Sequence, residues 1–422
     1  MNGDDSVHRL VDHLFRREAG RMVASLTRSF GPAHLDLAEE VVQEALVQAL
    51  KRWPFGGVPD QPVAWLYRVA RNLALDRFRR HKTFRGKAEV LARESLPLHD
   101  EAEDEGVFLS GEITDDQLRL IFLCCHPDLG RDARVALTLK AVLGFSVREI
   151  ARAFLSRETT VAQRLVRAQR RIKERGIPFE VPEPAELPAR LDAVLEALYL
   201  AFNEGYGAHE GDRLVRADLC AEALRLVAQL AEREDTGRPA VHALAALLSF
   251  QASRLPARVD DDGNLLLLAE QDRSRWDRGL LRQAFGHFSR AAAGDELTTY
   301  HLEAAIAAHH AKAASGGDTD WTAILGLYDQ LLALNPSPIV ALNRAVALAG
   351  LRGPEAGLAA VAEIETHPAL ADYYLLPATR ADLFARLGDT QQAAECYRQA
   401  LARPCSEPER RFLQRRLEGL AG

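Results

Sequence analysis

The chain has 422 residues, 47 % of them hydrophobic, and is therefore long enough for two or three domains that each bury a core. Its net charge of −7 conceals an asymmetry, because residues 1–178 carry 29 Lys and Arg against 25 Asp and Glu, whereas residues 179–422 carry 24 against 35. A basic front half and an acidic rear half favour nucleic acid as a partner of the front half alone.

Several protein classes are excluded at this stage. No apolar run approaches the roughly 20 residues of a membrane span, and the N-terminus lacks the pattern of a signal peptide. The five cysteines form neither a disulfide framework nor a zinc-binding spacing, so we expect a protein of the reduced cytoplasm. Helical periodicity runs through nearly every segment without sustained two-residue alternation, which predicts an all-α fold.

The first strong pattern is an amphipathic helix over residues 35–50. Its apolar side consists of Leu35, Ala38, Val42, Ala45, Leu46 and Ala49. Glu40, Gln43 and Glu44 lie on another side of the same helix, as the 3.6-residue period requires.

A loop from Pro54 to Pro62 precedes a second helix over residues 63–80. Between Arg68 and Lys87 there are eight basic residues and one acid, Asp76. Basic residues interleaved with Trp65, Tyr67 and Phe78 suit single-stranded DNA, because cations meet phosphates and aromatic faces meet bases. The alternative is that Trp65, Leu66, Val69, Leu73 and Phe78 form ordinary core, which we expect for most of them.

Two composition changes divide the chain. Residues 89–116 hold ten Asp or Glu and one basic residue, Arg93, and are predicted to be a linker. Four prolines between Pro178 and Pro188 interrupt helix formation. The predicted domains therefore cover residues 7–85, 113–178 and 187–422, with an acidic linker over residues 86–112.

Residues 145–176 predict a helix-turn-helix. Ser146 and Glu149 form a capping box that starts its first helix, whose apolar face is Val147, Ile150, Ala151 and Phe154. The second helix has a buried stripe of Val161, Leu165, Ala168 and Ile172. Its polar stripe suits base edges and phosphates in a major groove and consists of Thr160, Gln163, Arg164, Arg167, Arg170 and Arg171. A solvated arginine-rich face is the alternative.

Three segments in this order resemble bacterial RNA polymerase sigma factors, most closely the compact extracytoplasmic-function group. They are residues 38–44 (AEEVVQE), 64–76 (AWLYRVARNLALD) and 145–151 (FSVREIA). The resemblance covers residues 7–176. The chain departs from the family pattern at Glu40, where Asp is usual, and at Ala162, where Lys is frequent. The first change is chemically mild, and the second bears on the −35 specificity.

The resemblance implies a division of roles. Glu40, Gln43 and Glu44 would dock on the clamp helices of the RNA polymerase core enzyme. Promoter DNA would be opened at its −10 element by the second helix and the loop before it, through Arg68, Arg71, Asn72, Asp76, Arg79 and Arg80. The −35 element would be read by Arg148, Thr160, Gln163, Arg164, Arg167, Arg170 and Arg171. The acidic linker would run through the RNA exit channel, although a solvated tether fits its composition equally well.

The rear half predicts successive amphipathic helices, beginning with residues 187–203. Later ones are expected near residues 212–234, 239–254, 270–292, 296–314, 321–334, 338–350, 355–365, 371–387, 390–402 and 407–419. Pro336 and Pro404 end similar segments and are separated by 68 residues, two periods of 34, which resembles tetratricopeptide repeats. Such a domain could inhibit the front half in cis, hold it in an active posture, or bind a protein or peptide partner; regulation in cis is our preferred hypothesis.

Other candidate sites have simpler explanations. Cys124-Cys125-His126 is better explained by packing than by a metal, and a helix C-cap at Gly205 explains Asn203 to Tyr206 more simply than a small pocket. His301, His309 and His310 lack a metal-binding spacing. We expect no metal, no cofactor and no enzymatic activity. The rival hypotheses are a polymerase-independent helix-turn-helix regulator with a sensing repeat domain and a repeat scaffold whose front half is vestigial.

Overall fold

The structure, a computed structural model, describes residues 3–85, 110–153, 156–183, 185–207, 217–261 and 263–420. These residues form α-helices and turns, and the β pairing within them is an isolated bridge between Val259 and Leu265. The predicted all-α fold is therefore confirmed. The chain divides into two compact units, residues 1–197 and 198–422. Most of the expected acidic linker, residues 86–109, lies outside the described residues.

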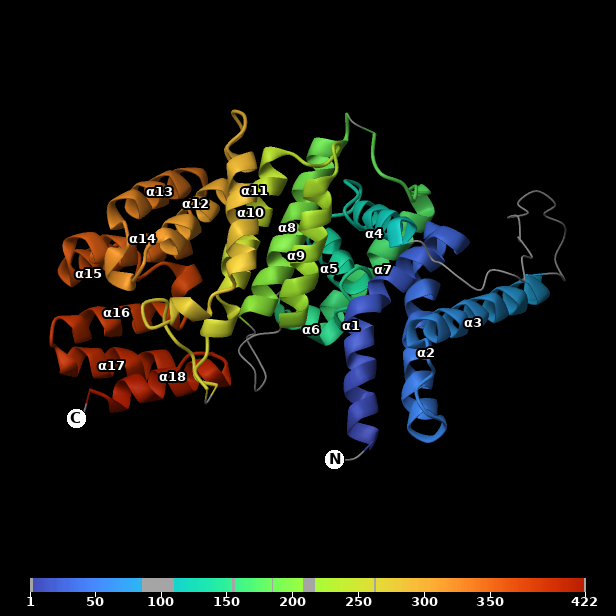
Figure 1. Ribbon diagram of the computed structural model, residues 1–422, viewed down its shortest axis with the longest axis horizontal. Helices are drawn as coiled ribbons and strands as arrows, with labels where there is room; N and C mark the ends of the chain where they lie inside the picture. The colour runs from blue at the N-terminus through green and yellow to red at the C-terminus, as the bar shows by residue number, and fades with distance from the viewer. Residues whose placement is uncertain are drawn as a thin grey trace. The chain divides into compact units, whose positions relative to one another are not determined.

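The N-terminal unit begins with three long helices (Figure 1). In chain order it contains α1 (Gly3–Phe30), the 3-10 turn η1 (Pro32–His34), α2 (Leu35–Gly56), α3 (Pro62–Arg85), α4 (Ser110–Cys124), α5 (Arg131–Ala141), α6 (Val147–Ala153), α7 (Glu158–Arg175) and the first part of α8 (Leu187–Tyr206). Helix α1 packs against α2 and α4, α2 packs against α3, and both α5 and α6 pack against α7. Met22, Leu66, Phe122 and Phe145 are among the largest fully buried side chains of this unit.

Helix α8 begins within the N-terminal unit and continues into the C-terminal one. Arg190 at its start is buried and donates a hydrogen bond to the Phe122 carbonyl of α4 at 2.5 Å. The helix runs through Gly205 and ends at Tyr206, and the Gly207 amide still donates to the Asn203 carbonyl. The predicted C-cap at Gly205 is therefore wrong, because the helical conformation continues past this buried glycine although glycine costs roughly 0.5 to 1 kcal/mol in a helix.

The C-terminal unit continues with helices that pack mostly on their neighbours in sequence (Figure 1). They are α9 (Ala217–Glu232), α10 (Pro239–Ser253), α11 (Arg278–Ala291), α12 (Thr299–Lys312), α13 (Trp321–Leu334), α14 (Pro338–Arg352), α15 (Pro354–Ala362), α16 (Leu375–Arg386), α17 (Thr390–Leu401) and α18 (Glu407–Glu418), with 3-10 turns η2 (Leu255–Ala257), η3 (Arg273–Arg275), η4 (Gly316–Asp318) and η5 (Pro368–Leu370). Helix α10 is buried along almost its whole length, because α9, α11 and α12 all pack against it.

The largest difference between a predicted and an observed helix boundary in the described part of this unit lies at the start of α11. The helix expected from about residue 270 begins at Arg278 instead. The Asp277 carboxylate accepts hydrogen bonds from the Gly279 and Leu280 amides at 2.7 and 3.0 Å and so caps the helix. The preceding residues form η3 and turns, whose hydrogen bonds end before the cap.

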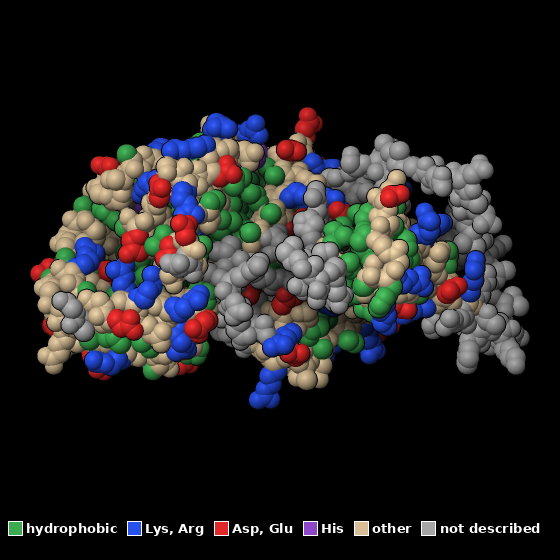
Figure 2. Space-filling model, turned by 60° about the horizontal axis from the view of Figure 1, so that its bottom comes forward, with side chains coloured by type: hydrophobic (Ala, Val, Ile, Leu, Met, Phe, Trp, Pro, Cys, Tyr) green, Lys and Arg blue, Asp and Glu red, His purple; other side chains and the backbone are tan. Residues whose placement is uncertain are grey.

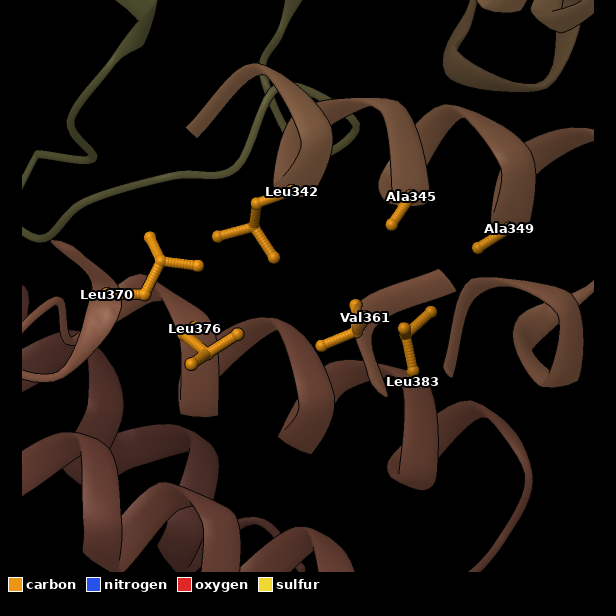
Figure 3. Packing of buried hydrophobic residues seen from close by; sticks show 7 residues of the cluster. All are labelled: Leu342, Ala345, Ala349, Val361, Leu370, Leu376 and Leu383. Carbon is orange, nitrogen blue, oxygen red and sulfur yellow. The ribbon is translucent and has the colours of Figure 1, made fainter. Parts of the chain in front are cut away.

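A leucine-rich cluster joins α14, α15, η5 and α16 (Figure 3). Its buried members are Leu342, Ala345, Ala349, Val361, Leu370, Leu376 and Leu383. Burying a leucine side chain contributes about 1.5 to 3 kcal/mol, so these contacts are enough to hold consecutive helices together. The helices near 321–334 and 390–402 form as predicted. Their assignment as tetratricopeptide repeats stays a prediction.

Candidate nucleic-acid interface

The outer face of α3 carries the predicted polar residues. Arg68, Arg71, Asn72, Asp76 and Arg79 are all exposed, and their spacing of three or four residues places them on one side of the helix. Side chains beyond Arg79 on this helix, including that of Arg80, lie outside the described residues. The structure therefore gathers five of the six residues predicted for the −10 element into one solvent-facing strip.

The inner face of α3 packs against α1 and α2. Leu66, Ala70 and Ala74 are fully buried there. Trp65 meets Trp53 of α2 edge to face at 5.4 Å between ring centroids, and Phe78 stacks on Phe30 of α1 at 4.9 Å. Both rings are half-buried in these contacts between helices, which is nearer to the interpretation as ordinary core than to free base-stacking surfaces.

Sequence reasoning missed an aromatic residue beside this helix. Phe55, at the end of α2, is 94 % exposed, and Val58 in the following loop is also exposed. A phenylalanine in a Pro/Gly segment that precedes a basic helix was the available signal. An exposed ring at this place can accept a stacked base, since every base has a π-face.

The three residues predicted to dock on polymerase lie on α2. Glu40 and Gln43 are exposed, and Glu44 is half-buried. One arginine of α3 pairs with both carboxylates, because Arg77 Nη1 lies 2.5 Å from Glu40 Oε2 and Arg77 Nη2 lies 2.7 Å from Glu44 Oε2. Sequence reasoning did not single out Arg77, which joins the acidic face of α2 to the basic helix α3.

The helix-turn-helix forms as predicted. The Ser146 amide donates to Glu149 Oε2 at 2.7 Å, and the Glu149 amide donates to Ser146 Oγ at 3.2 Å, which completes the capping box before α6. The four residues of the predicted buried stripe on α7 are buried, namely Val161, Leu165, Ala168 and Ile172. Phe154 lies outside the described residues.

The opposite side of α7 is polar and open to solvent. The exposed members of the predicted set are Arg148 on α6 and Thr160, Gln163, Arg167, Arg170 and Arg171 on α7. Arg164 is half-buried and pairs with Asp132 of α5 at 3.1 Å, whereas Arg170 pairs with Glu174 one turn away at 2.6 Å. Val166 is 63 % exposed among these residues and could meet a thymine methyl group, a contact that the polar pattern did not predict.

A third side of α7 contacts α2 across the N-terminal unit. Gln169 Nε2 donates to Glu39 Oε2 at 2.9 Å, and Glu39 is buried. Burial raises the pKa of the Glu39 carboxyl to about 7, against the opposing effects of Lys140 and of the Gln169 hydrogen bond. A small cavity beside this pair is lined by Glu39, Gln43, Lys140 and Phe145.

Glycine permits a close backbone approach at the same interface. A Cβ placed on Gly20 of α1 would lie 1.9 Å from the carbonyl oxygen of Val142, just after α5. No side chain fits at that distance, so the helix-turn-helix can approach α1 only because residue 20 is glycine. Neither Gly20 nor Glu39 stood out in the sequence, since their partners lie more than 100 residues away.

Comparison with known proteins identifies these two modules. The family model for sigma-70 region 2 matches residues 14–84, and the model for sigma-70 region 4 matches residues 119–172. The chain belongs to the sigma-70 family. In this sigma-family chain, region 2 therefore covers α2 and α3 with the docking and −10 candidates, and region 4 covers α6 and α7.

Two relatives extend the comparison. An uncharacterized protein of Rhizobium meliloti (strain 1021) is 41 % identical over 391 residues, which cover 92 % of this chain and 91 % of the relative. The probable ECF RNA polymerase sigma factor SigI of Mycobacterium tuberculosis (strain ATCC 25618 / H37Rv) is 31 % identical over 194 residues. That alignment covers 46 % of this sigma-family chain and 64 % of SigI, less than two thirds of its length.

The segment after region 4 matches a different model. Residues 190–292 match a family of unknown function, DUF6596. No solved structure matches the chain. In the part of this sigma-family protein that the structure describes, no helix has the length and apolar character needed to cross a bilayer, and no three His, Cys, Asp or Glu side chains are grouped to hold a metal ion.

Proposed function

We propose that this chain directs bacterial RNA polymerase to promoters in the cytoplasm, as a sigma factor of the extracytoplasmic-function type. Its two arginine-bearing helices would bind promoter DNA while α2 docks on the core enzyme. The observation that carries this proposal is the exposure of both predicted polar strips, on α3 and α7, within regions 2 and 4. The polymerase would supply the chemistry, so the chain itself would not be an enzyme.

The proposed role of α3 is to hold the opened −10 element. Arg68 and Arg71 point to solvent and can meet phosphates, whereas Asn72 can hydrogen-bond to base edges. Opening a duplex costs stacking energy, and each base that stacks on an aromatic ring returns about 1 to 3 kcal/mol. The exposed ring of Phe55 supports this role, because it provides such a surface beside α3.

The proposed role of α7 is to read the −35 element in the major groove. Gln163 and Arg167 have the side chains that pair with adenine and guanine edges. Arg170 and Arg171 extend the same strip toward the helix C-terminus, where cations can meet phosphates. The buried stripe on the opposite side fixes the rotation of α7, so the strip faces outward as a unit.

Docking on the core enzyme would use Glu40, Gln43 and Glu44. Glu40 and Gln43 are accessible on α2, and the carboxylates of Glu40 and Glu44 are held in place by Arg77. Fixed side chains lose less conformational entropy when a partner binds, which favours a preformed docking surface.

The C-terminal unit would regulate sigma activity in cis. Its acidic composition complements the basic front half, and α8 connects the two units without a break. The same helical surface could instead hold the front half in an active posture or bind a protein or peptide partner. These alternatives make different predictions for a shortened chain.

Transcription with purified components tests the central proposal. Core polymerase, promoter DNA and this protein together should yield a discrete transcript and permanganate-reactive thymines near the −10 element. Omission of any one of the three components should abolish both the transcript and the permanganate reactivity. The proposal fails if the protein does not bind core polymerase. It also fails if the protein changes the gel mobility of promoter DNA equally with and without polymerase, which is the outcome expected of a polymerase-independent regulator.

A chain that ends at Ala197 tests regulation in cis. This end point keeps Arg190 and the buried start of α8 on α4, which an end point near residue 180 would remove. A several-fold rise or fall of transcript yield, at equal occupancy of core polymerase, supports regulation by residues 198–422. Unchanged yield contradicts it.

A further inference from the structure

Tyr206, at the end of α8, is held by two arginines from the segment after α10. The Arg258 guanidinium lies 3.8 Å from the centre of the Tyr206 ring, and its Nη1 donates to the Tyr206 carbonyl. Arg254 Nη2 donates to the Tyr206 hydroxyl at 3.0 Å and to Gln251 Oε1. The aromatic ring therefore fixes two guanidinium groups beside each other.

A third arginine joins them from η3. Arg273 Nη1 donates to the carbonyl oxygens of His310 and Ala313 at 2.5 and 2.7 Å, at the end of α12. Its guanidinium also lies 4.9 Å from the centre of the Trp276 ring. The segment between α10 and α11 thus carries Arg254, Arg258 and Arg273, and Arg254 lies close enough to both of the others for its charge to act on them.

The charges in this cluster act on one another. Burial lowers the pKa of Arg258 and of Arg273, and the charge of Arg254 lowers both further. Burial, followed by Arg254 and Arg273, lowers the pKa of His310 to about 4. Each of these side chains nevertheless keeps part of its surface exposed, so the cluster is recessed but open to water.

Several arginines elsewhere in the C-terminal unit have acidic partners. On the face drawn in Figure 2, Asp and Glu side chains stand among Lys and Arg over the C-terminal unit. Typical pairs are Arg344 with Asp329 at 2.5 Å and Arg380 with Glu365 at 3.0 Å. Among the described residues, by contrast, no carboxylate forms an ion pair with any of the three clustered arginines.

Two carboxylates act on the cluster from a distance. The charge of Glu409 acts to raise the pKa of Arg258, and that of Asp318 acts to raise the pKa of Arg273, but each carboxylate is engaged elsewhere. Glu409 accepts hydrogen bonds from the Tyr374 hydroxyl and the Ser406 cap, and Asp318 accepts them from Ser315. Neither neutralises the cluster by direct contact.

The cluster also contains buried polar atoms that lack partners. Within the described part of the chain, Arg254 Nε, Trp276 Nε1 and His310 Nδ1 are buried without a hydrogen bond. A buried polar atom that loses its water and gains no partner costs about 1 to 3 kcal/mol, so these three atoms are left for a partner that the described chain does not supply.

Capping of helices explains only part of this arrangement. Arg258 and Arg273 donate to carbonyl oxygens at the ends of α8 and α12, where positive charge is favourable. Arg254 donates to two side chains instead and leaves its Nε unpartnered. Its placement beside two like charges needs another explanation.

We propose that Arg254, Arg258 and Arg273 form a binding site for a small ligand that carries an oxyanion, either a carboxylate or a phosphate. Such a group would neutralise the gathered positive charge and accept hydrogen bonds from the guanidinium groups. Tyr206 positions the arginines and does not itself contact the charge of the ligand. This site belongs to the C-terminal unit and is separate from the DNA-facing strips.

Calorimetry and thermal unfolding of the full-length protein test this site. Sodium phosphate and sodium citrate serve as the two probes, with sodium chloride at equal ionic strength as the reference. We expect at least one probe to bind saturably and to raise the unfolding midpoint above the chloride value. The tighter probe distinguishes a phosphate ligand from a carboxylate ligand.

Matched variants locate the binding. Arg254→Gln should weaken binding at least tenfold, and Tyr206→Phe should weaken it less, because the arginine remains but loses its hydroxyl anchor. Arg398→Gln, at an exposed ion pair with Glu395, should bind as the wild type does. If Arg254→Gln does not fold, the affinity of Tyr206→Phe for the probes is compared with that of the wild type instead.

Two results would overturn the proposal. One is that phosphate and citrate act no differently from chloride. The other is that Arg254→Gln, or Tyr206→Phe in its place, binds as tightly as the wild type. The double variant Arg167→Gln/Arg171→Gln checks the location, since loss of binding there would place the anion on α7 instead.

Discussion

Helices α3 and α7 carry similar arginine strips but are held by the rest of the protein in different ways. Helix α3 packs its apolar side on α1 and α2, and Arg77 joins it to the acidic face of α2. Helix α7 packs on α5 and α6 and reaches across to α2 through Gln169 and Glu39. The contact that holds α7 lies on a different side from its strip.

Because of this difference, the residues proposed to bind DNA can be distinguished from the residues that position the helix in α7 but less easily in α3. In α3, the face proposed for DNA and the residue that joins α2 lie within the same helical turns. In α7, the outer arginines and the Glu39–Gln169 contact involve different side chains, so each can be substituted without removing the other. The two functions of α7 can therefore be tested separately.

Reversing charge on the outer strip of α7 should have the largest effect. Arg167→Glu/Arg171→Glu replaces two exposed cations, and each lost contact with a base or phosphate costs about 1 to 3 kcal/mol, so promoter-specific transcription should fall about 100-fold. Competition with a promoter lacking the −35 element measures the loss of selectivity. Arg278→Glu, exposed in the first turn of α11, is the matched control. Preserved selectivity would contradict the proposed role of α7.

Shortening side chains on α3 should impair opening more than recruitment. Arg71→Ala/Asn72→Ala removes one cation and one amide from the exposed strip, and we expect open complexes to fall about 10-fold, since base contacts are worth about 1 to 3 kcal/mol. Permanganate reactivity reports opening, and co-purification reports binding to the core enzyme. Arg52→Ala, exposed on α2, is the control. Equal losses in both measurements would argue against a specific role in opening.

The sequence predicted well those features of α3 and α7 that depend on residues close together in the chain. Periodicity identified all four buried residues of α7, and the Ser146–Glu149 capping box was read from two residues because it involves only neighbours in sequence. The same periodicity placed the exposed residues of α3 on one face. The approach of Gly20 to Val142 depends on packing between distant segments, which no local pattern encodes.

Two further residues show where sequence reasoning stops. Glu39 lies next to Glu40 in sequence, yet one is buried and the other exposed, because α7 covers only one side of α2. Arg77 was one of eight basic residues in its segment, and only the packing of α3 on α2 distinguishes it from the exposed ones. Both effects arise from tertiary contacts.

A methyl group at Gly20 should loosen the contact between regions 2 and 4. Gly20→Ala forces α1 away from Val142, and such overpacking typically destabilises by about 1 to 3 kcal/mol. Gly326→Ala is the matched control, because nothing lies within 4 Å of its added Cβ in α13, and it should be neutral or slightly stabilising. Urea unfolding measures both. A Gly20 variant as stable as the control would show that this close approach is not maintained in solution.

The last predicted effect, which shows only as a difference between two pH values, is a dependence of stability on the Glu39 proton. The folded protein holds this proton to about pH 7, whereas the carboxyl of an unfolded chain loses it near 4.5. The folded state therefore binds more protons between these values, and its stability falls as pH rises through that window. Glu39→Gln cannot ionise and should become more stable relative to the wild type, by about 1 to 3 kcal/mol at pH 8 compared with pH 5.

Urea unfolding at pH 5 and pH 8 measures this difference. Asp60→Asn, an exposed substitution in the same unit, controls for the loss of one carboxylate. Parallel pH profiles for Glu39→Gln and the wild type would mean that Glu39 is hydrated in solution and that the contact with Gln169 does not bury it.

The forked pairing of Arg77 has a mechanical consequence. One guanidinium links two carboxylates of α2 to the helix whose next turns carry Arg71, Asn72 and Arg79. A protein that binds Glu40 and Glu44 would compete with, or add to, the ion pairs by which Arg77 joins α3 to α2. Binding of core polymerase to α2 and binding of opened DNA to α3 would then be coupled through Arg77.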